Sequence, residues 1–157
     1  MNLEKTYNPN EYEPGIYALW EQAGVFEPKG EGTPYSIVMP PPNANGNLHI
    51  GHALSFALED LLVRFHRMNG KDAILIPGAD HAGFETWVVY ERELEKLGKT
   101  RFEYSREQLY AQVWDFVDKQ RGNMELQLRA LGVGPAWNHL VFTLDEKVIN
   151  TVYQTFK

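Results

Sequence analysis

Hydrophobic residues recur at helical spacing through most of the chain and also gather in two short continuous runs. The recurring pattern predicts five helices, over residues 11–23, 49–68, 84–97, 105–131 and from 144 onward. It is most regular in the second helix, at Leu54, Leu58, Leu61, Leu62, Phe65 and Met68. A glycine follows each of the first four helices, which is typical of a helix end. Ser105 with Gln108, and Thr143 with Glu146, have the spacing of a capping box that opens a helix.

The two continuous apolar runs, Tyr35–Met39 and Ala73–Ile76, predict strands that each end at proline, which has no N–H for a sheet ladder. The second run shows no polar alternation, which is typical of a strand buried on both faces. A strand, the helix over 49–68 and a second strand predict a right-handed βαβ unit with parallel strands, and therefore an α/β fold. The loops at 40–52 and 77–83 leave from strand carboxyl ends, where ligand sites of open α/β sheets lie.

Composition narrows the class of protein. The 157 residues fit one domain, and 43% hydrophobic with 23% charged residues argue against wholesale disorder. The lack of cysteine excludes disulfides, cysteine-ligated metal and a thiol nucleophile. A net charge of −6 argues against a stand-alone binder of bare duplex nucleic acid. Since neither a secretory signal nor an apolar stretch of membrane-spanning length is visible, we expect a cytoplasmic protein with no membrane partner.

The loop Pro40–His52 carries the first candidate chemistry. Free backbone N–H groups and the helix dipole at the start of a helix favour anions. His49 and His52 share one face of the first turn, and Gly51 between them lets a flat ligand approach the backbone. These features suit a polyphosphate, because imidazoles can donate hydrogen bonds to phosphate oxygens. Two alternatives stay open: ordinary helix-capping histidines, or a zinc site completed by His81, Asp80 or Glu85.

The loop Pro77–Gly83 carries the second set of candidate functional residues. Asp80 stands at the carboxyl end of the neighbouring strand, where we expect it to face the histidine loop across a crevice. A carboxylate there could hold an ammonium group through charge-assisted hydrogen bonds. The alternative is that Asp80 caps the helix that follows.

The two loops together resemble those of class I aminoacyl-tRNA synthetases. His49-Ile50-Gly51-His52 follows Pro40-Pro41-Pro42-Asn43, and Pro77-Gly78-Ala79-Asp80-His81-Ala82-Gly83 comes after the second strand. The second loop is most similar to that of the valine-specific branch of the family. The resemblance covers essentially all of residues 1–157. It implies the N-terminal half of a Rossmann-like catalytic domain that ends near the insertion point of the editing domain.

The resemblance implies that valine and ATP form valyl-adenylate and pyrophosphate, and that the valyl group passes to valine tRNA. Family roles transfer to seven residues. The residues implied in catalysis are His49 and His52, those in ATP binding are Asn43, His49, Gly51 and His52, and those in amino-acid binding are Pro41, Pro42, Asn43 and Asp80. Magnesium accompanies the ATP, and no dedicated protein metal site is implied, because phosphates can supply much of its coordination.

The sequence departs from the family pattern at two positions and lacks several family segments. Ala136 precedes Trp137 where the family usually has an acidic residue, and Trp87 stands where a polar residue is expected. The Lys-Met-Ser-Lys-Ser signature, the editing insertion and the anticodon-binding part are absent. We therefore expect weak or no activity from this chain alone, with the remaining synthetase segments supplied in cis or in trans. Three alternatives remain: a non-catalytic fragment that binds ATP or an aminoacyl-adenylate, an isoleucine- or leucine-type synthetase, and a related nucleotidyltransferase.

Overall fold

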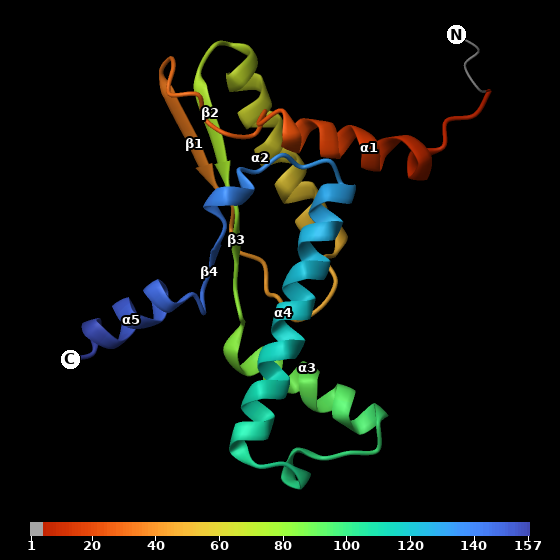
Figure 1. Cartoon of the computed structure of the whole chain (residues 1–157), viewed down its shortest axis with the longest axis vertical. Helices are drawn as coiled ribbons and strands as arrows, with labels where there is room; N and C mark the ends of the chain where they lie inside the picture. Colours follow the sequence, from red (N-terminus) through yellow and green to blue (C-terminus); the bar gives the residue numbers. More distant parts are fainter. Residues whose placement is uncertain (1–4) are drawn as a thin grey trace.

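The computed structural model describes residues 5–157 and shows helices around two small parallel sheets (Figure 1). The elements are α1 (Pro9–Gln22), β1 (Pro34–Val38), α2 (Ile50–Met68), β2 (Asp72–Ile76), β3 (Gly78–Ala79), α3 (Gly83–Lys96), the 3₁₀ helix η1 (Arg101–Glu103), α4 (Arg106–Ala130), the 3₁₀ helix η2 (Trp137–His139), β4 (Val141–Phe142) and α5 (Glu146–Thr155). All five predicted helices are confirmed. Residues 1–4, the start of the stretch considered for a secretory signal, lie outside the described part. No helix within residues 5–157 has the length and apolar character that crossing a membrane requires.

A βαβ unit forms the centre of the fold. β1 and β2 pair in parallel, from Pro34 beside Asp72 to Val38 beside Ile76, and α2 connects them and packs on both strands. The predicted α/β class with a βαβ crossover is thus confirmed. Burial alternates along β2, with Leu75 buried but Ile76 only half-buried. The prediction that this strand is buried on both faces is therefore wrong for one face.

The main core lies between this βαβ unit and α4, which runs across it (Figure 1). Its largest buried side chains come from the ends of the strands, from α2, from α4 and from the segment after α4, and they are Met39, Leu75, Phe56, Val63, Met124, Leu128 and Val133. The segment after α4 is fixed to the sheet, since the Ala136 N–H donates to the Leu75 carbonyl at 2.9 Å. Residues far apart in sequence, from Met39 to Phe142, therefore share one core.

The helix α2 turns its most regular apolar face away from this core. Leu54 and Leu61 are 63% and 61% exposed, and the other members of the stripe (Leu58, Leu62, Phe65 and Met68) are also exposed. The buried positions are instead Phe56, Asp60 and Val63. Helical periodicity identifies an apolar face but not the neighbour that this face contacts, so the leucine pattern alone does not show which side of α2 packs on the sheet.

The second parallel sheet was not predicted. β3 pairs with β4 from Gly78 beside Val141 to Ala79 beside Phe142. β3 lies within the segment 77–83, which the sequence predicts as a loop. Strands of two residues are too short to show alternation. The pairing also corrects the predicted start of the last helix. The N-cap of α5 is Asp145, and Thr143 lies at the end of β4, beside the Asp80 loop.

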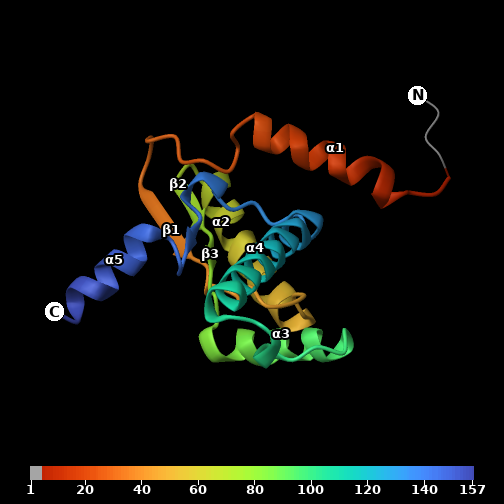
Figure 2. The same ribbon diagram turned by 60° about the horizontal axis from the view of Figure 1, so that its bottom comes forward.

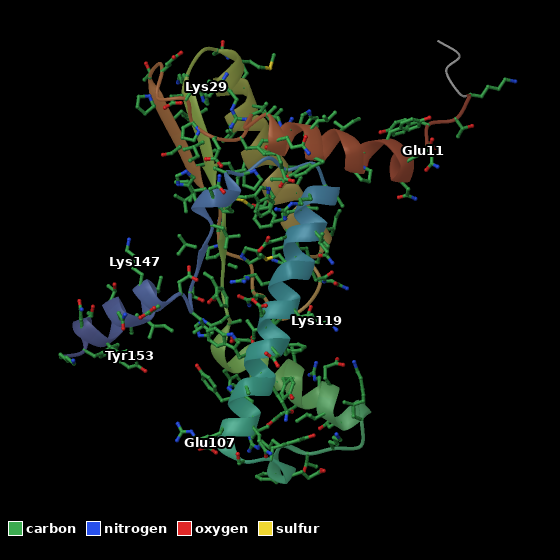
Figure 3. The ribbon with its side chains drawn as sticks, viewed as in Figure 1. Glu11, Lys29, Glu107, Lys119, Lys147 and Tyr153 are labelled. Carbon is green, nitrogen blue, oxygen red and sulfur yellow. The ribbon has the colours of Figure 1, made fainter. Side chains whose placement is uncertain are left out.

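The helices α1 and α5 extend from opposite sides of the core in both ribbon views (Figures 1 and 2). α1 is anchored by Tyr17, whose hydroxyl donates to the Val133 carbonyl at 2.8 Å and accepts from the Trp137 indole at 2.9 Å. Figure 3 shows α5 projecting from β4, with Lys147 and Tyr153 reaching outward. Residues 150–157 are exposed.

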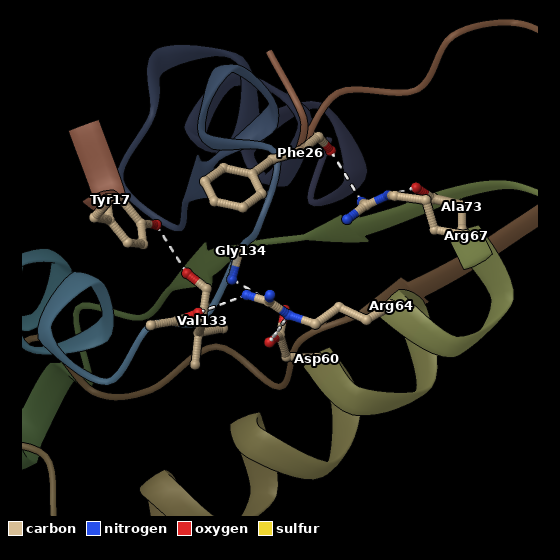
Figure 4. Close-up of polar contacts among 9 residues, drawn as sticks. Tyr17, Phe26, Asp60, Arg64, Arg67, Ala73, Val133 and Gly134 are labelled. Carbon is tan, nitrogen blue, oxygen red and sulfur yellow. Dashed lines mark hydrogen bonds and ion pairs between the residues drawn. The ribbon is translucent and has the colours of Figure 1, made fainter. Parts of the chain in front are cut away.

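A buried polar cluster ties α2 to the segment after α4 (Figure 4). Asp60 accepts the Gly134 N–H at 3.0 Å and the Arg64 Nε–H at 2.6 Å. Arg64 also donates through Nη2 to the Gly132 carbonyl at 2.7 Å. Position 134 requires glycine, because a Cβ there would overlap the ring of Phe26. The inward polar residue of α2 is therefore a structural hydrogen-bond centre.

Candidate functional site

The two histidines form a reciprocal cap at the start of α2. His49 is the N-cap residue, and its Nδ1 accepts the Gly51 N–H at 3.0 Å. His52 is the third helical residue, and its Nδ1 accepts the His49 N–H at 3.2 Å. Their ring centroids lie 3.9 Å apart. The predicted common face is confirmed, and the capping interpretation is correct for both rings.

The cap also determines what the rings can offer a ligand. An Nδ1 atom that accepts a hydrogen bond carries no proton, so a neutral ring has its proton on Nε2. Among residues 5–157, no acceptor takes either Nε2–H. The turn therefore presents two neutral N–H donors side by side at a helix N-terminus, a combination that suits an anion.

Gly51 is required by the cap itself. A Cβ at this position would lie 2.8 Å from Cε1 and 3.0 Å from Nδ1 of the His49 ring. The missing side chain thus leaves room for the imidazole of His49 to bond back to the helix. This steric reason adds to the predicted approach of a flat ligand and does not depend on it.

We predict an acid-sensitive cap. Burial lowers the pKa of His52 below its ordinary 6.5, and the adjacent His49 lowers it further. The stabilisation from neutral His52 is therefore present above pH 6.5 and is lost as the pH falls through the lowered pKa, where Nδ1 becomes protonated. In His49→Ala, the pKa of His52 measured by NMR titration should rise towards 6.5. His66→Ala, at the other end of α2, should leave it unchanged. A His52 pKa that is insensitive to His49→Ala would contradict the assignment.

The loop before α2 and the loop after β2 are joined through their backbones. The Asp80 N–H donates to the Pro42 carbonyl at 2.9 Å, and the Asp80 carbonyl accepts the Ala44 N–H at 2.7 Å. Asn43 is thereby the bridge partner of Asp80. The structure thus brings Pro42 and Asn43 beside Asp80, and Pro41 packs against Gly78, since a Cβ on Gly78 would lie 3.1 Å from the Pro41 Cβ.

Asp80 does not cap the next helix. The N-cap of α3 is Ala82, in the left-handed conformation with φ 57°, and no side chain bonds to the end of α3 there. The Asp80 carboxylate accepts instead from the Thr143 hydroxyl at 3.0 Å, and its side chain is 35% exposed. The capping alternative is therefore wrong, and the carboxylate stays accessible from solvent.

Several residues that shape the site were missed by the sequence analysis. Gln127 of α4 accepts the Leu48 N–H at 2.8 Å and donates to the Asn47 side chain at 2.8 Å, which fixes the loop just before His49. Thr143 reaches Asp80 from 63 residues away. No local pattern indicates these contacts, because the partners of Gln127 and Thr143 are distant in sequence.

Trp87 and Ala136, the two departures from the family pattern, have distinct surroundings. Trp87 lines a cavity of about 250 Å³ between α3 and α4, together with His81, Tyr110 and Trp114. Its ring packs edge-on against Tyr90, with centroids 6.5 Å apart. Ala136 is fully buried, so the place of the usual acidic residue is here a packed position beside the end of β2.

The described residues do not favour a zinc site. Nowhere in residues 5–157 do three His, Cys, Asp or Glu side chains converge as a metal would need. Both capping histidines already use Nδ1 for the backbone. His81, offered above as a third ligand, has its Nδ1 at 2.6 Å from the Thr143 hydroxyl.

Comparisons with known proteins identify the family and the fold of the chain. The family model described as tRNA synthetases class I (I, L, M and V) matches residues 15–157. Two curated relatives named valine–tRNA ligase, from Rhizorhabdus wittichii and Caulobacter vibrioides, are 44% and 45% identical over 99% and 98% of this chain. The chain spans only 18% and 17% of their lengths. A solved ternary complex, Agrobacterium radiobacter K84 agnB2 LeuRS-tRNA-LeuAMS, matches with a TM-score of 0.75 at 20% identity, over 96% of this chain and 17% of that one. This likeness indicates a shared fold.

Proposed function

Because the chain belongs to the class I tRNA synthetases of the isoleucine, leucine, methionine and valine group, we propose that it forms the N-terminal half of the active site of a valine–tRNA ligase. One observation carries the proposal. The capped His49–His52 turn and the Asp80 loop follow adjacent parallel strands, and the segment before the turn is joined to the Asp80 loop by backbone hydrogen bonds of Pro42 and Ala44. On this proposal, residues 1–157 are part of one catalytic domain, and the remaining synthetase segments complete it in cis or in trans.

In the proposed activation step, a carboxylate oxygen of valine attacks the α-phosphorus of ATP. The new P–O bond forms as the bond to pyrophosphate breaks. The Nε2–H groups of His49 and His52 donate to phosphate oxygens, where negative charge builds up in the transition state. The exposed position of His49 and the unused Nε2–H of both rings support this role. Neutral imidazoles are sufficient for it, because each ring can donate its Nε2–H to a phosphate oxygen.

Asp80 holds the α-ammonium of valine in this proposal, with Pro41, Pro42 and Asn43 as its neighbours in the amino-acid pocket. The accessible carboxylate supports the role of Asp80, and the backbone bonds to Pro42 and Ala44 support a pocket shared by both loops. Asn43 and Gly51 border the nucleotide. Catalysis is then mostly a matter of position and charge stabilisation, with no covalent intermediate on the protein.

Magnesium enters as part of the ATP substrate. Mg²⁺ keeps several waters and takes phosphate oxygens readily, so it needs few protein ligands. The side chains of His49 and His52 supply hydrogen bonds to phosphate in this proposal and do not coordinate the metal. The tRNA is the final acceptor of the valyl group, in the cytoplasm.

The test is valine-dependent exchange of labelled pyrophosphate into ATP by the purified chain. We expect measurable but slow exchange with valine, and less with isoleucine or threonine. A hydrolysis-resistant sulfamoyl analogue of valyl-adenylate tests the half-site separately, because its binding, measured by calorimetry, requires no turnover. The isoleucyl and threonyl analogues are the controls, and they should bind more weakly.

Asp80→Asn should weaken binding of the valyl analogue by about 10- to 100-fold, the scale of a charge-assisted hydrogen bond. ATP alone should bind this variant as it binds the parent. Binding without exchange would identify a half-site that needs the missing segments for turnover. A folded chain that neither exchanges pyrophosphate nor binds the valyl analogue would refute the proposal.

A further inference from the structure

We infer that Thr143 is a positioning residue for Asp80, with the His81 ring held in its Nδ1–H form as the third member of the cluster. The inference rests on the proposed role of Asp80 as the group that binds the amino acid's ammonium. Thr143 does not touch the ligand in this inference. It acts by fixing one carboxylate oxygen of Asp80 so that the other stays open to solvent and to a ligand.

The inference follows from the distribution of hydrogens around one hydroxyl. The Thr143 Oγ1 lies 3.0 Å from Asp80 Oδ1, 2.9 Å from the His81 backbone N and 2.6 Å from His81 Nδ1. A hydroxyl has one proton to donate and two lone pairs to accept with. An ionised carboxylate can only accept, so the hydroxyl proton goes to Asp80. Both nitrogens of His81 must then be donors, which requires a proton on Nδ1.

The backbone holds this cluster from two sides. The Thr143 N–H donates to the Ala79 carbonyl at 3.1 Å, as part of the pairing between β3 and β4. On the other side, the Asp80 N–H and carbonyl are bonded to Pro42 and Ala44. The main chain on either side of the carboxylate is therefore fixed, and its side-chain rotation is the remaining freedom.

The Thr143 hydroxyl removes that freedom. It occupies Oδ1, whereas no residue within 5–157 hydrogen-bonds to Oδ2. The side chain remains 35% exposed, so Oδ2 is available to a ligand. Binding to a pre-oriented acceptor costs less conformational entropy, because the Asp80 side chain is already held in place. The benefit applies to an ammonium ligand, because only its charge pairs with the carboxylate.

The test compares two ligands and three variants. The ligands are the sulfamoyl analogue of valyl-adenylate and its counterpart with the α-amino group replaced by hydroxyl. Thr143→Val, which keeps the side-chain shape and removes the hydroxyl, should weaken binding of the amino analogue about tenfold, the size of a lost hydrogen bond to a charged group. Thr143→Ser should bind within about twofold of the parent. Thr151→Val, a matched change on α5, should bind like the parent.

Two further readouts separate positioning from a general structural effect. Binding of the hydroxyl analogue should be nearly unaffected by Thr143→Val, and Thr143→Val should add little in an Asp80→Asn background. Equal weakening of both ligands, or an undiminished effect without Asp80, would overturn the inference.

A ligand-free measurement distinguishes failure of this inference from failure of the proposed function. Nitrogen NMR of the parent chain near neutral pH should show His81 protonated at Nδ1. A His81 ring protonated only at Nε2 would overturn the inference. A parent chain that binds neither analogue would refute the proposed function. The nitrogen spectrum would still show whether His81 carries its proton on Nδ1, as the hydrogen-bonded cluster requires. The spectrum needs no variant, so the test survives if Thr143→Val fails to fold.

Discussion

Replacing Asp60 with alanine is expected to lower the free energy of unfolding by about 3 kcal/mol, measured by urea denaturation. Asp60 is buried on the inward face of α2, where it accepts from the Gly134 N–H and from Arg64. Its removal leaves the N–H of buried Gly134 without a partner and frees the guanidinium of Arg64 beside the core. An unpaired buried donor costs more than the hydrogen bond itself contributed.

Two variants sharpen this prediction. Asp60→Asn keeps an oxygen that can accept from Gly134, so it should cost less than the alanine variant. Leu61→Ala is the neighbouring control, and it should change stability by about 0.5 kcal/mol or less, because Leu61 lies on the exposed stripe. If Asp60→Ala proved no more destabilising than Leu61→Ala, the hydrogen bonds of Asp60 to Gly134 and Arg64 would not stabilise the fold as predicted.

The double variant His49→Ala, His52→Ala is expected to reduce valine-dependent pyrophosphate exchange by about 10³-fold or more. Removing a single hydrogen-bond donor to a developing charge typically costs about 10²–10³ in rate. The double variant removes both Nε2–H donors of the capped turn. It also removes the cap, which stabilises α2 by about 1 kcal/mol.

The control must therefore separate the loss of the cap from the loss of the proposed hydrogen bonds to phosphate. Asparagine is a favoured N-cap residue, so His49→Asn should keep the stability of α2 while removing the imidazole donor. We expect this variant to unfold at nearly the parental urea concentration and to exchange about 10²-fold more slowly. Parental exchange by His49→Asn would mean that the histidine serves the helix alone.

The sequence alone was sufficient for the parts of the fold that local patterns control. Glycine stops and capping residues predict the bounds of α2 and α4 correctly, because these signals lie in the sequence directly at the helix ends. The direction in which α2 faces could not be predicted. Its leucine stripe has the stronger periodicity, yet the Phe56–Val63 face is the buried one. That choice depends on contacts with α4 and the segment around Gly134, more than 60 residues away.

The candidate site likewise has a part that the sequence predicts and a part that depends on distant contacts. His49, His52 and Asp80 were identified because their residue types and their place after strand ends indicate chemistry. The interaction between the two loops could not be predicted, since it runs through backbone atoms of Pro42, Ala44 and Asp80 that have no sequence signature. Thr143 was assigned to a helix start, because its spacing from Glu146 is a valid local signal that tertiary structure overrides.

The pairing of β3 with β4 has a consequence for the order in which the chain folds. Contacts between residues far apart in sequence form slowly, because closing a long loop costs entropy before any interaction compensates for it. α2 and its two strands lie within a short segment, whereas Thr143 follows Asp80 by 63 residues. On a ribosome, which releases the N-terminal part first, the histidine turn can fold while β4 is still unsynthesised. The surroundings of Asp80 are therefore completed late, and a nascent chain forms its histidine turn before Thr143 can bond to the Asp80 carboxylate.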